Sequence, residues 1–161
     1  MTEAQIVDLR DRPEFLPAVI EQNFAQWAPF ADIDHAGMVR LFPIDNPRGD
    51  MPITLIALLD ERYVGCVSLR ARTMGMTMHP EAYLEASPWL SNMWVATEAR
   101  GRKLASRLTL AVEDQARALG VQRLYSSTAL PQSLYHKLGY RDLEQRSFKG
   151  GTIYLIYKDL G

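Results

Sequence analysis

The chain of 161 residues is 47% hydrophobic and 23% charged, a composition that predicts a folded globular protein. Its formal net charge of −1 argues against a general nucleic-acid binder, because such proteins neutralise many phosphates with lysine and arginine. Since Cys66 is the only cysteine, an intrachain disulfide and a cysteine zinc cluster are both excluded.

No segment of the sequence predicts export or insertion into a membrane. The N-terminal residues are polar and charged, and the longest apolar run, residues 53–59, is far too short to cross a bilayer. We therefore expect a cytoplasmic protein without a membrane or nucleic-acid partner. The length favours one domain over residues 1–161, because neither a long linker nor an internal repeat interrupts the chain.

The first half of the chain predicts two helices between strands. The elements expected there are a strand (6–9), a helix from Pro13 to Pro29, a weaker helix (34–41) and two hairpin strands (53–59 and 63–72). The apolar face of the first helix consists of Phe15, Val19, Ile20, Phe24 and Trp27. Gly65 lies early in the second hairpin strand, where a side chain would obstruct a neighbouring backbone. We expect Cys66 to be a small buried residue rather than a nucleophile, because nothing pairs it with a base.

The segment after the hairpin, residues 73–88, predicts an irregular loop because glycine and proline recur in it. Residues 89–95 then have strand spacing, and an amphipathic helix follows that Gly120 ends. The helix face that we expect to be buried consists of Leu104, Leu108, Ala111, Val112 and Leu119. The helix residues that we expect away from this face are Arg102, Ser106, Glu113 and Arg117.

The last third of the chain completes a mixed α/β pattern. The elements expected there are a strand (121–127), a short helix (131–138) and two hairpin strands (140–147 and 152–158). The whole predicts an α/β (α+β) fold in which helices flank a mixed sheet. One parallel strand–helix–strand crossover between residues 89 and 127 would hold a ligand, because ligands of open sheets bind where neighbouring strands part.

The basic turn at the start of the central helix predicts an anion site. The first N–H groups of a helix have no partner within the helix, and the helix dipole is positive at this end. Arg100, Arg102 and Lys103 add positive charge, so a pyrophosphate fits there. The alternative is a solvated basic helix start, which is common in α/β proteins. The turn has neither a Rossmann G-x-G-x-x-G motif nor a P-loop.

Two segments resemble the GNAT family of N-acetyltransferases, and the resemblance covers about residues 64–157. The first segment is Arg100-Gly101-Arg102-Lys103-Leu104-Ala105, which is similar to the family pattern of Arg or Gln, two residues, Gly, one residue, then Gly or Ala. Lys103 replaces the middle glycine, and we interpret it as contributing a helical amide that does not require glycine. The second segment, residues 128–140, is similar to Asn-x-x-Ala-x-x-Leu-Tyr-x-Lys-x-Gly-Phe, with matches at Leu134, Tyr135, Lys137 and Gly139. Thr128 and Pro131 replace the usual Asn and Ala.

The resemblance implies a GNAT-like, mostly antiparallel sheet and acetyl-coenzyme A in the gap between strands 89–95 and 121–127. The pantetheine would pair with the backbone of strand 89–95 like an added strand, and the pyrophosphate would contact the amides of residues 102–105. The residues implied to bind the cofactor are Met93, Trp94, Val95, Arg100, Gly101, Arg102, Lys103, Leu104, Ala105, Ser106 and Thr128. No metal ion is implied.

The resemblance also implies direct attack of an amine on the thioester. A backbone N–H near Met93 would stabilise the developing oxyanion, and Tyr135 would be the general acid that protonates the leaving thiolate. Many relatives have a glutamate base at the position of Ser91, and serine cannot replace it near neutral pH. The base therefore stays open between water alone and a carboxylate that acts directly or through water, the candidates being Glu81, Glu85, Asp32 and Asp34.

We therefore expect an acetyl-CoA-dependent N-acetyltransferase that acts on a primary amine of a small molecule or peptide. The alternative is a non-catalytic acyl-CoA-binding or sensing module, which Ser91 and Lys103 keep open. The acceptor cannot be identified from the sequence, although Phe30 and Tyr83 lie in expected loops that would line its pocket. Relatives are often dimers, so a homodimer also stays open.

Two further groups of polar residues are interpreted without a catalytic role. Asp32, Asp34 and His35 suggest a metal site only at first sight, and we expect a surface helix cap instead, because no second cluster of ligands accompanies them. His136 lies beside Tyr135 on the short helix, so its side chain is expected to point elsewhere and to be exposed.

Overall fold

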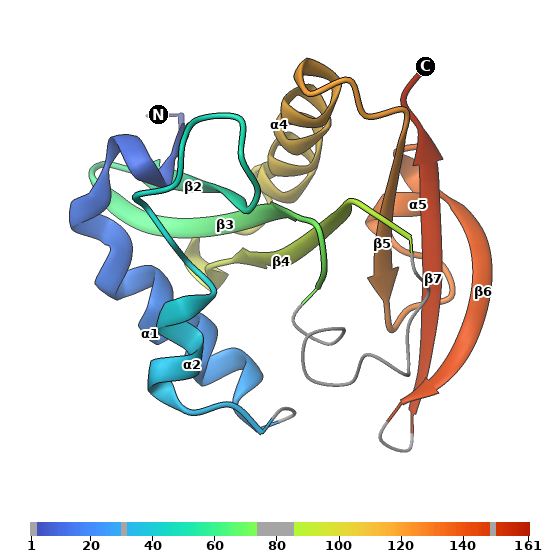
Figure 1. Ribbon diagram of the computed structural model, residues 1–161, viewed down its shortest axis with the longest axis horizontal. Coiled ribbons are helices and arrows are strands. Elements are labelled where there is room, and N and C mark those ends of the chain that lie inside the picture. Colours follow the sequence, from blue (N-terminus) through green and yellow to red (C-terminus); the bar gives the residue numbers. More distant parts are fainter. Residues whose placement is uncertain (1–2, 30–31, 74–85, 149–150) are drawn as a thin grey trace.

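A computed structural model describes residues 3–29, 32–73, 86–148 and 151–161 of the chain (Figure 1). Its strands form one sheet in the order β1-β2-β3-β4-β5-β7-β6. The strands are β1 (Gln5–Asp8), β2 (Ile53–Leu59), β3 (Arg62–Arg70), β4 (Trp89–Val95), β5 (Arg123–Thr128), β6 (Arg141–Phe148) and β7 (Gly151–Asp159). Within the described residues every neighbouring pair is antiparallel except β4 and β5, which are parallel. The mixed, mostly antiparallel sheet expected from the sequence is confirmed.

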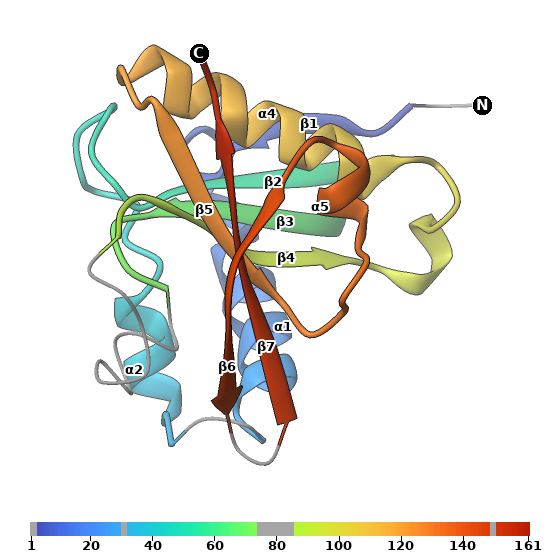
Figure 2. The same ribbon diagram turned by 90° about the vertical axis from the view of Figure 1, so that its right-hand side faces the viewer.

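Helices cover both faces of the sheet, as Figure 2 shows. On one face lie α1 (Leu16–Trp27) and α2 (His35–Arg40), and on the other lie α4 (Leu104–Ala118) and the single turn α5 (Leu134–Lys137). Every residue of β2 is buried, as is typical of a strand that is covered on both faces. One apolar core therefore packs α4 against the sheet, and a second packs α1 and α2 against the opposite face.

Several element boundaries differ from the sequence prediction for local reasons. Pro13 begins a 3-10 turn, η2 (Pro13–Phe15), which follows the turn η1 (Leu9–Asp11), so α1 begins only at Leu16. After α4, Gly120 has a φ of 78°, and the N–H of Val121 donates to the carbonyl of Ala116. This bond binds Val121 to the helix end, and β5 begins at Arg123 instead.

Two predictions about the faces of α4 are wrong. Glu113, which we expected away from the buried face, is 0% exposed. Its carboxylate accepts hydrogen bonds from the Tyr140 hydroxyl at 3.0 Å and from Lys158 Nζ at 2.9 Å, so its charge is paired inside the core. Leu119, which we expected to be buried, is 39% exposed because it follows the last residue of the helix.

The predictions for Gly65 and Cys66 are confirmed. A Cβ at Gly65 would lie 3.0 Å from the Trp94 carbonyl oxygen and 3.3 Å from Leu108 Cδ1, so only glycine lets β4 and α4 approach this closely. Cys66 is buried between the sheet and α1.

Within the described residues no helix is long and apolar enough to span a membrane. The same residues contain no group of three or more His, Cys, Asp or Glu side chains that would hold a metal ion.

Candidate active site

The parallel strands β4 and β5 separate soon after they meet. Their register contains one Cα pair, Trp89 with Tyr125, supported by a bond from the Tyr125 N–H to the Pro88 carbonyl at 3.1 Å. One residue further along each strand, the Ser126 hydroxyl donates to the Leu90 carbonyl at 3.1 Å. Beyond this point the strands diverge, as Figure 1 and Figure 2 both show. The second half of β4 therefore has an open backbone edge on the side of β5.

A bulge in β4 lies where the strands part. The pairing with β3 changes from Ser68–Ser91 to Cys66–Trp94, so β4 contains one extra residue between these pairs. Asn92, inside the bulge, has a φ of 61°. The predicted cofactor contacts Met93, Trp94 and Val95 follow the bulge and are partly exposed. The Trp94 ring packs against Tyr63 with 5.2 Å between centroids, so Trp94 offers the site its backbone rather than its ring.

The basic turn between β4 and α4 consists of exposed residues. It follows a 3-10 turn, η4 (Thr97–Ala99), and leads directly into the N-terminus of α4. Among the described residues, no side chain forms an ion pair or hydrogen bond with the side chains of Arg100, Arg102 or Lys103. No side chain caps the helix, so the first N–H groups, including those of Ala105 and Ser106, lack a partner within the helix. Unpaired cations and unpaired N–H groups thus meet at one helix end.

The interpretation of Lys103 as a helical residue is wrong. Lys103 immediately precedes α4 and has φ 56° and ψ 27°, which is the left-handed conformation. Glycine adopts this conformation freely, whereas a residue with a Cβ loses roughly 1–2 kcal/mol. Lys103 therefore has the backbone conformation that glycine usually adopts, although it is not glycine. Gly101, with a φ of 83°, is a second left-handed residue in the same turn.

The predicted acid Tyr135 lies on α5, which a capping box holds in place. The N–H and hydroxyl of Ser133 both lie 3.0 Å from His136 Nδ1, and His136 Nε2 lies 2.8 Å from Asp142 Oδ1. The His136 side chain is only 11% exposed, so the expectation that it is exposed is wrong, and its role is to fix the turn. Tyr135 is partly buried and packs edge-on against Tyr140 with 5.6 Å between ring centroids.

Burial also raises the pKa of Tyr135 above its ordinary value. The phenol is protonated at neutral pH with or without this shift, and the higher pKa makes it a weaker proton donor. Thr128 lies at the end of β5, and its hydroxyl accepts a bond from the Leu130 N–H at 3.2 Å. The segment from β5 to α5 therefore begins on the β5 side of the gap between β4 and β5, opposite β4.

A sequence model of the "Acetyltransferase (GNAT) family" matches residues 11–140, most of the chain. The chain belongs to the GNAT family of acetyltransferases. The resemblance noted in the two sequence segments is thus confirmed. Among curated proteins the sequence has no match.

Solved GNAT structures share the fold over nearly the whole chain. An aminoglycoside 6′-acetyltransferase type Ii has a TM-score of 0.72 at 17% identity, with 99% of this chain and 98% of that chain covered. An aminoglycoside 6′-N-acetyltransferase in complex with coenzyme A has a TM-score of 0.70 at 16% identity, with 98% and 97% covered. N-acetylglutamate synthase from Neisseria gonorrhoeae, with coenzyme A and N-acetyl-glutamate, has a TM-score of 0.64 at 14% identity, with 100% and 36% covered. At these identities the likeness concerns the fold.

The structure narrows the search for the base of this GNAT protein without naming it. The Asp34 carboxylate accepts a bond from the Gly37 N–H at 2.7 Å, so it caps α2 as expected. Asp32 is exposed, and His35 lies 2.9 Å from Glu21. Ser91 pairs with Ser68 in the sheet. Four predicted residues, Phe30, Glu81, Tyr83 and Glu85, lie outside the described residues.

A buried polar network on the α1 side of β4 was missed at the level of sequence. Arg70 Nε donates to Asn92 Oδ1 at 2.6 Å, and the Cys66 thiol donates to the Asn92 carbonyl at 3.1 Å. A signal for it existed, since Cys66, Ser68 and Arg70 alternate with apolar residues and therefore share one face of β3. An arginine at a position that faces the protein interior predicts a buried polar partner.

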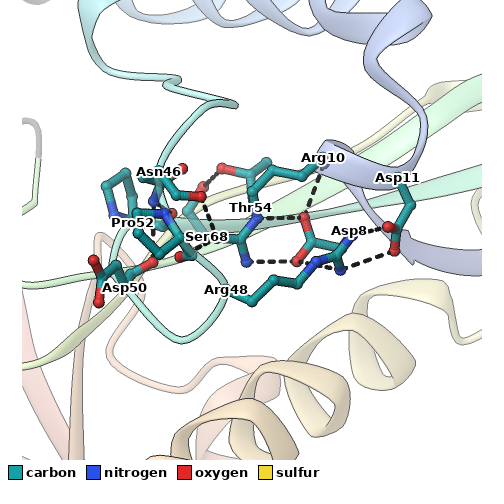
Figure 3. A network of polar contacts seen from close by, with 10 residues as sticks. Asp8, Arg10, Asp11, Asn46, Arg48, Asp50, Pro52, Thr54 and Ser68 are labelled. Carbon is teal, nitrogen blue, oxygen red and sulfur yellow. Dashed lines mark hydrogen bonds and ion pairs between the residues drawn. The ribbon is translucent and has the colours of Figure 1, made fainter.

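A separate cavity of about 510 Å³ lies between β1, residues 48–49 and α4. Four of its charged groups belong to the network drawn in Figure 3, in which Asp8 binds Arg10 and Arg48 pairs with Asp11. A fifth, Asp114, pairs with Arg117 at 3.4 Å. These pairs balance one another, so the cavity offers no unpaired charge to a ligand. The gap between β4 and β5 remains the better candidate for the GNAT site.

Proposed function

We propose that the protein is an acetyl-CoA-dependent N-acetyltransferase that acts on the primary amine of a small molecule or peptide. The observation that carries the proposal is the gap between β4 and β5, because it leads from an open strand edge to an uncapped helix end with three unpaired cations. Family membership and the GNAT relatives that bind coenzyme A support the same cofactor for this chain.

The cofactor would occupy the gap from end to end. Its pantetheine amides would pair with the open edge of β4 at Met93–Val95, as a peptide does when it adds a strand to a sheet. Its pyrophosphate would accept bonds from the free N–H groups at the start of α4, helped by the helix dipole and by Arg100, Arg102 and Lys103. The predicted contacts of β4 and of the turn before α4 would line one side of the cofactor, and Thr128, at the end of β5, would lie on the other.

The chemistry is a single transfer of an acetyl group. The neutral amine attacks the thioester carbon, a backbone N–H near Met93 stabilises the oxyanion, and the C–S bond then breaks as the new C–N bond is retained. The amine proton passes to water or a carboxylate, and Tyr135 gives its phenolic proton to the leaving thiolate and regains one from solvent. The phenol is protonated before every turnover, as it also would be at its ordinary pKa, so the raised pKa of Tyr135 is compatible with this role without favouring it.

Calorimetric titration tests the cofactor site. Coenzyme A should bind, and pantetheine, which lacks the pyrophosphate, should bind far more weakly. Arg102→Glu should weaken coenzyme A binding about tenfold or more by repelling the phosphates. Arg62→Glu makes the same charge change at an exposed position in β3 and serves as the control. Equal binding of coenzyme A and pantetheine would contradict the phosphate site.

Thiol release from acetyl-CoA in the presence of an amine panel tests the activity. Tyr135→Phe should lower kcat about 100-fold, the usual scale for losing a general acid. Tyr157→Phe, on β7 opposite Tyr125, is the matched control and should retain full activity. Tight binding of coenzyme A with no thiol release from any amine would instead favour the non-catalytic binding module, for which Ser91 at the usual glutamate position is the supporting feature.

A further inference from the structure

Arg70, the last residue of β3, is a buried cation that has no counter-ion among the described residues. The residue is 4% exposed, and its guanidinium lies over the Phe42 ring at 4.7 Å. Nε donates to Asn92 Oδ1, whereas Nη2 is buried without a hydrogen-bond partner. Among the described residues no carboxylate forms an ion pair with this guanidinium. Within the part of the chain that the structure describes, Nη2 therefore has hydrogen-bonding capacity that no group uses.

Such an arrangement is unfavourable for folding alone. Removing a guanidinium from water costs several kcal/mol unless an anion and hydrogen bonds compensate it. Burial lowers the pKa of Arg70 to about 10, which still leaves the group fully charged at neutral pH. An apolar side chain beside Phe42 would avoid this cost, so the retained charge indicates a role outside the fold's own stability.

The position of Arg70 connects it to the reaction site. Its partner Asn92 lies in the β4 bulge and directly precedes Met93, whose backbone would hold the thioester. Arg70 also contacts Phe42, just beyond α2, so it lies on the sheet face covered by α1 and α2. The start of α4, where the pyrophosphate would bind, covers the opposite face. An acceptor that binds on the α1 and α2 side would therefore lie on the same side of β4 as the guanidinium, whose Nη2 is enclosed in this structure.

We propose that Arg70 determines acceptor specificity by binding a carboxylate, and that the acceptors are amino acids. This proposal rests on the acetyltransferase function proposed above. A carboxylate matches the two parallel Nη donors in a planar, bidentate geometry and supplies the missing counter-charge. Polyamines and other acceptors that carry only positive charge would be repelled by the same group.

Matched substrate pairs test the specificity in the wild-type protein. Each amino acid is compared with its methyl ester and its primary amide, which keep the amine and remove the negative charge. We expect kcat/KM to be at least about 100-fold higher for the acid, because the ester leaves a buried cation unpaired. The series should include amines at the α, β and γ positions, since the best spacing reports the distance from Arg70 to the thioester. Equal turnover of acids and esters would overturn the proposal while leaving the acetyltransferase function intact.

Two variants assign the selectivity to the residue. Arg70→Gln should abolish the preference for acids, and Arg70→Lys should retain part of it with a raised KM, because lysine keeps the charge but not the bidentate geometry. Arg72→Gln, an exposed arginine two residues away, is the control and should retain the full preference. Retained preference in folded Arg70→Gln would overturn the assignment.

A binding experiment separates this proposal from the proposed function. With coenzyme A present, calorimetry compares an N-acetyl amino acid with its methyl ester on the wild-type protein, so no turnover and no variant is needed. Tighter binding of the acid supports the carboxylate site even if no amine releases thiol, an outcome that would reject catalysis alone. Equal binding of both compounds, or binding of neither, rejects the carboxylate site.

Discussion

Two arginines, the partly buried Arg10 and the buried Arg70, have opposite surroundings. The Arg10 side chain is 8% exposed, and it donates to both carboxylate oxygens of Asp8 and to the Pro47 carbonyl (Figure 3). The hydrogen bond to Asp8 raises the pKa of Arg10, whereas desolvation lowers that of Arg70. A buried cation with all its partners inside the fold stabilises the fold. A buried cation without them is explained more simply by a partner that arrives from outside.

The largest effect on stability should come from breaking the satisfied pair. Asp8→Asn leaves Arg10 buried without its counter-charge, and we expect the free energy of unfolding to fall by about 2 kcal/mol. The loss is below that of a fully buried pair because the Asp8 side chain keeps 12% exposure. Urea unfolding measures it. Asp11→Asn, which breaks only the exposed pair with Arg48, should cost less than about 1 kcal/mol.

Acid should remove the same interaction without a mutation. Burial favours the protonated form of Asp8, but the hydrogen bonds from the side chain and N–H of Arg10 outweigh it and lower the pKa below 3.8. The stabilisation is therefore complete above pH 4 and is lost as the pH falls through the folded-state pKa. Urea unfolding between pH 2 and 7 should show a shallower acid loss for Asp8→Asn than for the wild type. Parallel curves would mean that Asp8 does not contribute.

Replacing Arg70, by contrast, should change the free energy of unfolding only slightly. Arg70→Met removes a buried charge and one hydrogen bond to Asn92, two effects that nearly cancel, so we expect a change within about 1 kcal/mol or a small gain. Arg10→Met is the matched control, and it should lose more than about 2 kcal/mol. A loss of similar size in both variants would show that Arg70 is held by interactions within the fold and would remove the contrast.

The smallest effect concerns the exposed cation Lys103. Lys103→Gly should raise the free energy of unfolding by about 0.5 kcal/mol, because relief of the left-handed strain exceeds the added freedom of the unfolded chain. Lys103→Ala removes the same charge but keeps the strain, so it should show no gain. Both variants should bind coenzyme A more weakly than the wild type by the same charge effect. Thermal unfolding and calorimetry report the two quantities.

The sequence predicted best where one local signal was sufficient. The bounds of β2 follow from a continuous apolar run, and Gly65 follows from the close approach of two backbones. The predictions failed where a distant partner decides. Glu113 is buried because Lys158, 45 residues later, reaches it, and no local pattern contains that contact. Lys103 is left-handed because the turn requires it, against the preference of lysine.

The residues of the candidate site show the same difference between local signals and distant contacts. The basic turn and Tyr135 could be predicted as candidates because each belongs to a contiguous motif. Arg70 could not be predicted in this way, because its interpretation depends on the bulge at Asn92 and on the lack of a carboxylate partner among the described residues, neither of which a contiguous motif shows. Among the described residues, therefore, the sequence predicts the candidate cofactor contacts, whereas the proposed acceptor contact, Arg70, emerges only from the structure.

The short seam between β4 and β5 has a mechanical consequence. One backbone pair and the Ser126 hydrogen bond join β4 to β5. The helix α4 therefore helps to hold the two halves of the sheet together, because its Glu113 accepts a hydrogen bond from Lys158 on β7. A cofactor bound along β4 would add backbone hydrogen bonds at the place where the two halves of the sheet separate. Amide hydrogens of Met93–Val95 should then exchange with deuterium more slowly in the loaded protein, and its melting temperature should climb with ligand concentration.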